Sequence, residues 1–527
     1  MNLLHSVIAR ALRVQSVWLV AACVFAWLAV ASWTRPLISP DEGRYVGVAW
    51  NMLGAGEWLT PLLNGLPFFH KPPLFYWITA FALKLFGVNE WAGRFSSALG
   101  ATVMAAMLFW FLKRYTHGRL AGLAVLVLAL QPFLFGGAHY ANLDMTVAGI
   151  ISATIFLGAA AVLHLESGKP YRGLLALAYV LAGLGFLAKG LIGVVLPGAV
   201  LLFWMLGRRQ FSSVQRVLWL PGIALFLLIC LPWMLYMQAR YPGFVDYYIV
   251  YQHFQRFVQG GFNNPHPFWF YVPVLLVLTL PWSIQLWRVC RRSFWCTGGP
   301  DPVRSLMVWW LVVIVGFFSI PTSKLIGYVL PALAPLAYFV ARAFHDRLQG
   351  EAADKALRTL SWSFLVAVII CLAAVVAMVV KPQPSSKGLA KKMLADYGTH
   401  DYVVMLDYLR YDLNFYLGTV KPAIVVADWA ASDIAYTDNW RKELYDAAAF
   451  NPGLGEQLLI NRDGFPDFLC RPHDARLWLV ADRAAVANYP LLKGLQPFAE
   501  DGRLVVWRIE PGVTQPFCAE MPRTGLK

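Results

Sequence analysis

The chain has 527 residues, of which 59% are apolar and only 14% are charged, and its mean hydropathy is +0.56. This composition excludes an ordinary water-soluble protein of the same length and predicts a membrane protein. The formal net charge of +15 calls for no nucleic-acid partner, because basic residues accumulate in the cytoplasmic loops of membrane proteins.

Apolar runs near the length of a membrane-spanning helix recur along the first 380 residues. They predict a mainly α-helical, polytopic protein with about eleven to thirteen transmembrane helices. The eleven runs are 17–33, 95–112, 120–135, 145–163, 174–187, 191–206, 217–237, 268–286, 303–320, 327–344 and 362–380.

Basic residues in the short loops predict the orientation of these helices. With Arg10 and Arg13 in the cytoplasm, alternate loops are rich in Lys and Arg, as the positive-inside rule requires. An odd number of spans then places the C-terminal segment on the outer side. The loops 35–94, 136–142, 240–267 and 321–326 are expected on that side as well.

The composition changes after residue 380. The stretch "KPQPSSKGLAKK" is typical of a linker, and "DYVVML", "PAIVVAD", "RLWLVAD" and "RLVVWRI" predict short strands among helical stretches. We therefore divide the chain into a membrane domain, 1–380, and a small outer α/β domain, 381–527. Cys470 and Cys518 both fall in the outer domain and could pair if that side is oxidising.

The first outer loop, 35–94, begins with "ISPDEGRYVG" and continues through two amphipathic stretches expected to lie at the membrane surface. Two interpretations of its start stay open. Ser39 and Glu42 could form a capping box that only begins a helix. Alternatively Asp41, which shares a helical face with Arg44 and Tyr45, could be a functional carboxylate.

Three cations from separate outer loops favour the functional interpretation. Lys71, Arg256 and Lys324 lie where the positive-inside rule disfavours positive charge, so together they predict an anion site such as a lipid phosphate. Singly, each is more simply a snorkelling or solvated side chain. Their outer-side neighbours include His253, His266, Tyr328 and Asp144, the last an acid at the end of a span that needs a partner.

At these residues the sequence resembles lipid-linked-sugar glycosyltransferases of the protein mannosyltransferase type, and most closely the bacterial aminoarabinose transferases that modify lipid A. The resemblance rests on "SPDEGRYVGVAWNML", "FFHKPPLFYW", "LDMTV", "LAKGLIG", "PHPFWFYVP" and "FFSIPTSKLIGYVLPALAP", within about residues 37–335. It implies a GT-C-like membrane fold in the bacterial inner membrane, with an active site and a C-terminal domain that face the periplasm.

The resemblance implies an inverting transfer of a sugar from undecaprenyl phosphate to lipid A, with 4-amino-4-deoxy-L-arabinose as the expected sugar. Asp41 matches the catalytic aspartate, supported by Glu42, Arg44, Tyr45 and Asp144. The implied donor-phosphate contacts are Lys71, Arg256, Lys324 and Tyr328. No cofactor is required. The family often has an acid where this chain has His70, so a divalent metal held by His70 and His253 stays an open question.

Two alternatives remain from the sequence. A protein O-mannosyltransferase that uses polyprenyl-phosphate mannose would share the same donor chemistry. A lipid or polysaccharide transporter would instead need ionisable residues inside the membrane, for which Lys189 is the main candidate. We expect Lys189 at an interfacial turn rather than within a span.

Overall fold

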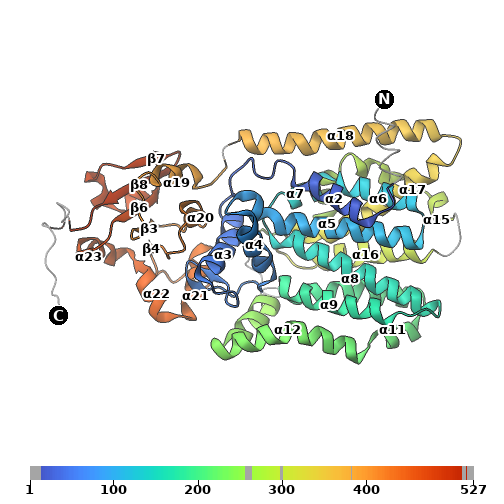
Figure 1. Ribbon diagram of the computed structural model, residues 1–527, viewed down its shortest axis with the longest axis horizontal. Coiled ribbons are helices and arrows are strands. Elements are labelled where there is room, and N and C mark those ends of the chain that lie inside the picture. The colour runs from blue at the N-terminus through green and yellow to red at the C-terminus, as the bar shows by residue number, and fades with distance from the viewer. Residues whose placement is uncertain (1–13, 256–263, 297–300, 382, 513–517, 519–527) are drawn as a thin grey trace. The chain divides into compact units, whose positions relative to one another are not determined.

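The computed structural model describes residues 14–255, 264–296, 301–381, 383–512 and 518, without the side chains of residues 253–255 and 296. The chain forms two compact units (Figure 1). The helical unit contains Met1–Arg35, His70–Ile78 and Glu90–Pro382. The sheet unit contains Pro36–Phe69, Thr79–Asn89 and Gln383–Lys527, so most of the first outer loop groups with the C-terminal residues. The division at residue 380 stays a prediction.

The helical unit consists of apolar helices joined by short loops. Figure 1 shows α5, α8, α9 and α12 side by side. Its elements are α2 (Val17–Ala29), α5 (Glu90–Tyr115), α6 (Gly118–Ala129), α7 (Pro132–Ala138), α8 (Leu143–Glu166), α9 (Arg172–Lys189), α10 (Ile192–Gly207), α11 (Phe211–Val217), α12 (Leu220–Arg240), the π-helix η1 (Asp246–Gln255), α14 (Tyr271–Leu278), the 3₁₀-helix η2 (Trp282–Arg288), α15 (Arg292–Cys296), α16 (Pro302–Ser319), the 3₁₀-helix η3 (Ile326–Ala332), α17 (Leu333–Leu348) and α18 (Ala353–Val380).

Within the described residues, seven helices are long and apolar enough to cross a membrane, or eight if α6 and α7, bent by 64°, form one span. Each of the eleven predicted runs contains helical structure, but some helices are short. α2 and α10 have 13 and 16 residues, and the run 268–286 is divided between α14 and η2. Length alone therefore supports fewer spans than the sequence predicts.

Small residues allow the central helices to approach closely. A Cβ atom on Gly149 of α8 would lie 2.1 Å from the carbonyl oxygen of Gly100 on α5, so neither backbone leaves room for a side chain at that crossing. Such contacts between small residues are the usual basis of helix packing in a membrane, where the hydrophobic effect between helices is weak.

The sheet unit contains a six-stranded mixed sheet and the helices around it. Its elements are α3 (Asp41–Ala55), the hairpin β1 (Leu62–Leu63) and β2 (Leu66–Pro67), α19 (Lys387–Met393), β3 (Tyr402–Leu406), α20 (Leu413–Leu417), β4 (Ile424–Ala427), α21 (Trp440–Ala449), α22 (Pro452–Leu458), β5 (Leu459–Asn461), η4 (Arg462–Gly464), α23 (Phe465–Cys470), β6 (Leu477–Asp482), η5 (Ala485–Asn488), η6 (Pro490–Gly494), β7 (Ala499–Asp501) and β8 (Leu504–Ile509). Helix α4 (Leu74–Phe86) is shared between the two units.

The strands lie in the order β5-β4-β3-β6-β8-β7, and β5, β4, β3 and β6 are parallel. The chain runs from β3 outward to β4 and β5 and then returns to place β6 on the other side of β3. Both faces of the central strands are buried, which explains their continuous apolar sequences. All four predicted strands are confirmed as β3, β4, β6 and β8.

Helix α3 of the first outer loop packs on the segment that follows β3. A Cβ atom on Gly43 would lie 3.0 Å from the backbone nitrogen of Asp412, and one on Gly47 would lie 2.9 Å from the carbonyl oxygen of Tyr411. The two glycines, one turn apart, therefore let the helix backbone contact this segment directly. Cys470 and Cys518 form a disulfide with a Cα–Cα distance of 5.6 Å, as the sequence allowed.

Candidate functional site

The predicted capping box at the start of α3 is wrong. The helix begins at Asp41 with Pro40 as its N-cap residue, and no side chain caps it. The backbone N–H of Ser39 donates to the carbonyl oxygen of Pro384 rather than to Glu42. Glu42 is fully buried and instead accepts a hydrogen bond of 2.9 Å from the backbone N–H of Ile38. Glu42 therefore has a structural role at the start of α3, but its hydrogen-bond partner is Ile38 and not Ser39.

Asp41 and Arg44 share one face of α3, as predicted from their spacing. The Arg44 guanidinium donates from Nη2 to Asp41 Oδ1 at 2.7 Å and from Nη1 to Oε1 of Glu443 on α21. Tyr411 donates to the second oxygen of Glu443 at 2.6 Å. Because the guanidinium binds two carboxylates at once, it fixes the first helical turn of α3 against the outer α/β fold.

This group, Asp41, Arg44, Tyr411 and Glu443, is called the Arg44 cluster below. Its exposure increases from one end to the other, with side chains 8% exposed at Glu443, 18% at Arg44 and 43% at Asp41. Burial lowers the pKa of Arg44, but the charges of Glu443 and Asp41 outweigh it and the pKa lies well above its usual value. Burial also raises the pKa of Tyr411, which therefore stays a donor.

Tyr45 contributes an aromatic face to the same cluster. It is 8% exposed, and the centre of the Arg44 guanidinium lies 5.0 Å from its ring centroid. A cation held over an aromatic face gains electrostatic stabilisation, which adds to the fixed position of Arg44. The cluster thus leaves Asp41 as its most exposed carboxylate, in a defined orientation.

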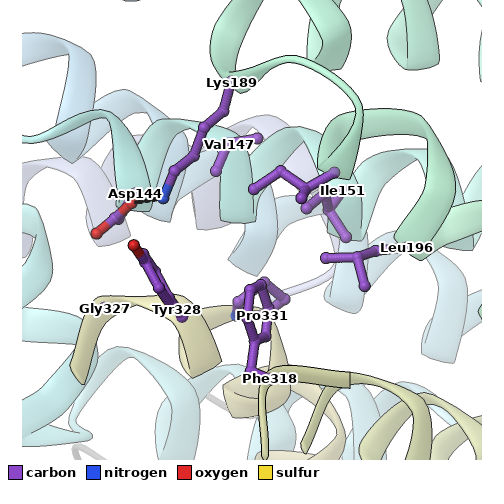
Figure 2. Close-up of a pocket in the computed structure, with 10 residues that line it drawn as sticks. Asp144, Val147, Ile151, Lys189, Leu196, Phe318, Gly327, Tyr328 and Pro331 are labelled. Carbon is purple, nitrogen blue, oxygen red and sulfur yellow. Dashed lines mark hydrogen bonds and ion pairs between the residues drawn. The ribbon is translucent and has the colours of Figure 1, made fainter. Parts of the chain in front are cut away.

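A second cluster lies in the helical unit around Asp144, in the first turn of α8. Lys189, the last residue of α9, forms an ion pair with Asp144 Oδ1. Its ammonium lies 4.5 Å from the ring centroid of Tyr328, on η3 (Figure 2). Gly327 permits this approach, since a Cβ atom there would lie 2.4 Å from Asp144 Oδ2. Lys189 thus lies at the end of a candidate span and supplies the partner that Asp144 needs, while its position at the membrane interface stays a prediction.

These residues line a small pocket whose remaining walls are apolar (Figure 2). Sites for small molecules usually enclose about 300–1,000 Å³. The space enclosed in this structure is about 10 Å³, room for about one water molecule, so a phosphate group or an isoprene unit would enter only if the walls moved apart. The apolar lining residues are Val147, Ile151, Ile192, Leu196, Phe318 and Pro331.

Lys324 is not among the residues that line this pocket. It is 2% exposed, and its ammonium donates to the carbonyl oxygens of His266, at 2.9 Å, and Pro321. A bridge between Pro265 and Ser323 joins the same two outer segments. The visible role of Lys324 is therefore to tie these segments together, and its role as a phosphate contact stays a prediction.

Two more of the predicted residues, His70 and Lys71, lie just before α4. Lys71 is half-buried immediately before the two prolines that precede α4. His70 is 8% exposed, and its ring centroid lies 6.0 Å from that of Tyr247 on η1. The side chain of His253 and all of Arg256 lie outside the described residues. Among the residues that are described, no group of three His, Cys, Asp or Glu side chains could hold a metal ion.

Sequence reasoning missed three residues of these clusters. Glu443 and Tyr411 lie in the outer α/β domain, where no motif was recognised, and Lys189 was considered only as evidence for transport. A signal for Lys189 was present in "LAKGLIG", because a lysine at the end of an apolar run needs an acid and Asp144 needs a cation. No comparable signal marks Glu443 among the 29 acidic residues of the chain.

Comparison with known proteins gives a consistent result. Residues 70–236 match the family model described as dolichyl-phosphate-mannose-protein mannosyltransferase. The chain is 30% identical over 431 residues to the undecaprenyl phosphate-alpha-4-amino-4-deoxy-L-arabinose arabinosyl transferase of Enterobacter sp. (strain 638), covering 81% of this chain and 72% of the relative. It is 32% identical over 361 residues to the protein of that name from Aeromonas salmonicida, covering 67% of this chain and 64% of the relative.

Solved structures support the fold independently. ArnT from Cupriavidus metallidurans bound to undecaprenyl phosphate is 24% identical and has a TM-score of 0.78, with 93% of this chain and 97% of that chain covered. The archaeal oligosaccharyltransferase AglB from Archaeoglobus fulgidus has a TM-score of 0.53 at 13% identity, with 88% and 69% covered. The predicted GT-C-like fold with a small C-terminal α/β region is confirmed by these similarities.

Proposed function

Because the chain belongs to the family of undecaprenyl phosphate-alpha-4-amino-4-deoxy-L-arabinose arabinosyl transferases, we propose that it is an inverting glycosyltransferase of the bacterial inner membrane. The donor is undecaprenyl phosphate carrying 4-amino-4-deoxy-L-arabinose, and the acceptor is lipid A presented at the periplasmic face. The chain matches 64% of the length of the Aeromonas salmonicida relative, so donor, acceptor and location are all part of the proposal.

The Lys189 pocket is the observation that supports this function best. An ammonium group held by Asp144 beside the Tyr328 ring, next to apolar walls, matches the charge of a phosphate and the apolar character of the first isoprene carbons of a lipid-linked sugar. A polyprenyl chain would pack on the apolar walls while the phosphate contacts the cation. Lys71, Arg256 and Lys324 are proposed as further contacts to the same phosphate.

The proposed reaction is one displacement at the anomeric carbon of the sugar. An acceptor oxygen forms the new bond, the bond from that carbon to the lipid-phosphate oxygen breaks, and its electron pair stays on the phosphate. Cations fixed at the leaving group stabilise this developing charge, which lowers the barrier. Undecaprenyl phosphate is the second product.

Asp41 is proposed to act on the acceptor. Its carboxylate is oriented by Arg44 and is the most exposed member of the Arg44 cluster. An acceptor phosphate of lipid A is already largely ionised near neutral pH and needs orientation more than deprotonation. A hydroxyl acceptor would lose its proton to the carboxylate, in ordinary general-base catalysis.

Protein O-mannosyltransfer is the second candidate, and the matched family model at residues 70–236 favours it. The deciding experiment supplies the purified protein in nanodiscs with a polyprenyl-phosphate sugar and either lipid A or acceptor peptides, and identifies the products by mass spectrometry. Donor-dependent modification of lipid A is the expected result. Modified peptides would establish the second candidate, and no product with either acceptor would overturn both.

A further inference from the structure

The outer α/β domain has an unassigned cluster at the carboxyl ends of its parallel strands. Its chain order reverses between β3 and β6, because β4 and β5 follow on one side of β3 and β6 returns to the other. In open α/β sheets, ligands bind outside the carboxyl ends of the strands at such a reversal. The residues that follow β3, β4 and β6 therefore lie where this architecture places a ligand.

Side chains at this edge combine aromatic faces with paired charges. Arg410, which follows β3, donates to Asp482 at the end of β6 at 3.2 Å, and the two residues bridge the reversal point. The Arg410 guanidinium also lies 4.6 Å from the ring centroid of Tyr408. The side chains of Arg410 and Asp482 are 15% and 29% exposed, so this pair is partly accessible to solvent.

Two tryptophans extend the aromatic surface. The Trp440 ring, at the start of α21, lies 5.8 Å from the rings of both Tyr408 and Trp429, at angles of 50° and 82°. All three aromatic side chains are half-buried. Three segments, after β3, after β4 and at the start of α21, thus bring three aromatic rings together beside the Arg410–Asp482 pair.

This surface is close to the carboxylate proposed to act on the acceptor. Trp440 and Glu443 are three residues apart on α21 and so lie on one face of that helix, about 4.5 Å apart along its axis. Glu443 binds Arg44, which binds Asp41. A group bound at Trp440 is therefore separated from Asp41 by one helical turn and one shared guanidinium.

We propose that Tyr408, Trp429, Trp440 and Arg410 form a subsite for the saccharide headgroup of the acceptor lipid, an inference that rests on the proposed glycosyl transfer. The C–H face of a sugar ring packs on aromatic rings, and its hydroxyls are matched by the hydrogen-bonding groups of the Arg410–Asp482 pair. A nucleotide fits less well, because "DYLR" after β3 lacks the glycines that let a backbone cradle phosphates.

Binding is tested without transfer by saturation-transfer NMR on the full chain in nanodiscs, with glucosamine 1-phosphate and glucosamine as probes. The parent should give sugar-proton signals that inorganic phosphate does not displace. Trp440→Ala should lose these signals, whereas Trp440→Phe, which keeps an aromatic face, should retain them. Tyr445→Ala is the matched control, because Tyr445 is an exposed aromatic residue on the same helix.

Kinetics test whether the same subsite serves transfer. Trp440→Ala should raise KM for the acceptor about tenfold and leave KM for the donor unchanged, as expected for loss of one stacked ring. Signals that persist in Trp440→Ala, or that inorganic phosphate displaces, would overturn the subsite. If Trp440→Ala fails to fold, Arg410→Gln is tested in its place. Undiminished sugar-proton signals in Arg410→Gln would also overturn the subsite. A parent that binds the probes but transfers nothing refutes the proposed function and leaves the subsite standing.

Discussion

Asp41 and Glu42 are adjacent in the sequence but have different surroundings. Glu42 is fully buried and accepts from the Ile38 backbone, whereas Asp41 is 43% exposed and bound by Arg44. Glu42→Gln keeps an acceptor oxygen, so we expect a folded and largely active protein. Asp41→Asn keeps the hydrogen bond to Arg44 but loses the charge, and transfer should fall about 10²- to 10⁴-fold.

The measurement is sugar transfer and thermal stability of both variants under identical conditions. A fully active Asp41→Asn variant would mean that this stretch only begins a helix and that the proposed role of Asp41 is wrong.

Glu443 is expected to position Asp41 through Arg44. Glu443→Gln leaves the largely buried guanidinium with one carboxylate, which should cost about 3 kcal/mol of stability. The freed guanidinium can then bind both oxygens of Asp41, so we expect kcat to fall while KM for the donor stays unchanged.

Tyr411→Phe is the matched control for Glu443. It removes one hydrogen bond to the same carboxylate and leaves both ion pairs in place. Its kcat should therefore stay much closer to that of the parent. Equal losses of kcat in the two variants would show that Glu443 acts only through stability.

Two contacts of Arg44 show how much of the candidate site could be predicted from the sequence. The Asp41–Arg44 contact follows from a spacing of three residues on a helix. The Arg44–Glu443 contact joins residues 399 positions apart, and nothing local to either one indicates the other. Local spacing could therefore identify half of the Arg44 cluster, and tertiary packing supplies the rest.

At the scale of elements, the Lys189 pocket joins the ends of α8 and α9 with η3. Lys189→Ala should raise KM for the donor about 10- to 100-fold, because it removes a desolvated phosphate contact. Lys71→Ala should act in the same direction if it serves the same phosphate. Transfer kinetics at varied donor concentration measure both effects, and unchanged kinetics in both variants would remove the proposed donor site.

The importance of the contact between α3 and the segment after β3 can be tested by a substitution that changes no reacting group. Gly47→Ala places a Cβ atom 2.9 Å from the carbonyl oxygen of Tyr411, so one of the two segments must move. We expect a loss of about 1–3 kcal/mol in stability. Transfer should fall as well, because a shift of α3 would move Asp41 and Arg44 relative to Glu443. Gly453→Ala is the control, because a Cβ atom there would meet no neighbouring atom within 4 Å. Gly56→Ala is unsuitable, because the φ of +68° at Gly56 strains residues other than glycine.

Helices and strands with a clear local sequence pattern were predicted, and those without one were missed. Continuous apolar runs predicted β3, β4, β6 and β8, which are buried in the sheet. The three-residue strands β5 and β7 lie at the two edges and were missed, since so short a run carries no period. In the run 268–286, hydropathy predicted one span but could not indicate the break between α14 and η2.

At the scale of the whole molecule, the sheet unit combines two segments that lie far apart in the sequence. Most of the first outer loop folds together with the residues from Gln383 onward, and their shared contacts include Asn64, whose side chain both donates to and accepts from the backbone of Ala423. The odd number of spans predicted from the apolar runs is consistent with this arrangement, because it places both segments on the same side.

This arrangement makes the predicted topology testable with single cysteines. In a background where the free cysteines are replaced, Asp41→Cys and Tyr445→Cys should both react with a membrane-impermeant maleimide added to the periplasmic side. Arg291→Cys, in a loop predicted to be cytoplasmic, should react only after the membrane is permeabilised. Labelling of residues 41 and 445 from opposite sides would contradict the topology and the sheet unit together. Arg44 could not then bind Glu443, because the hydrocarbon core of about 30 Å is far wider than an ion pair can bridge.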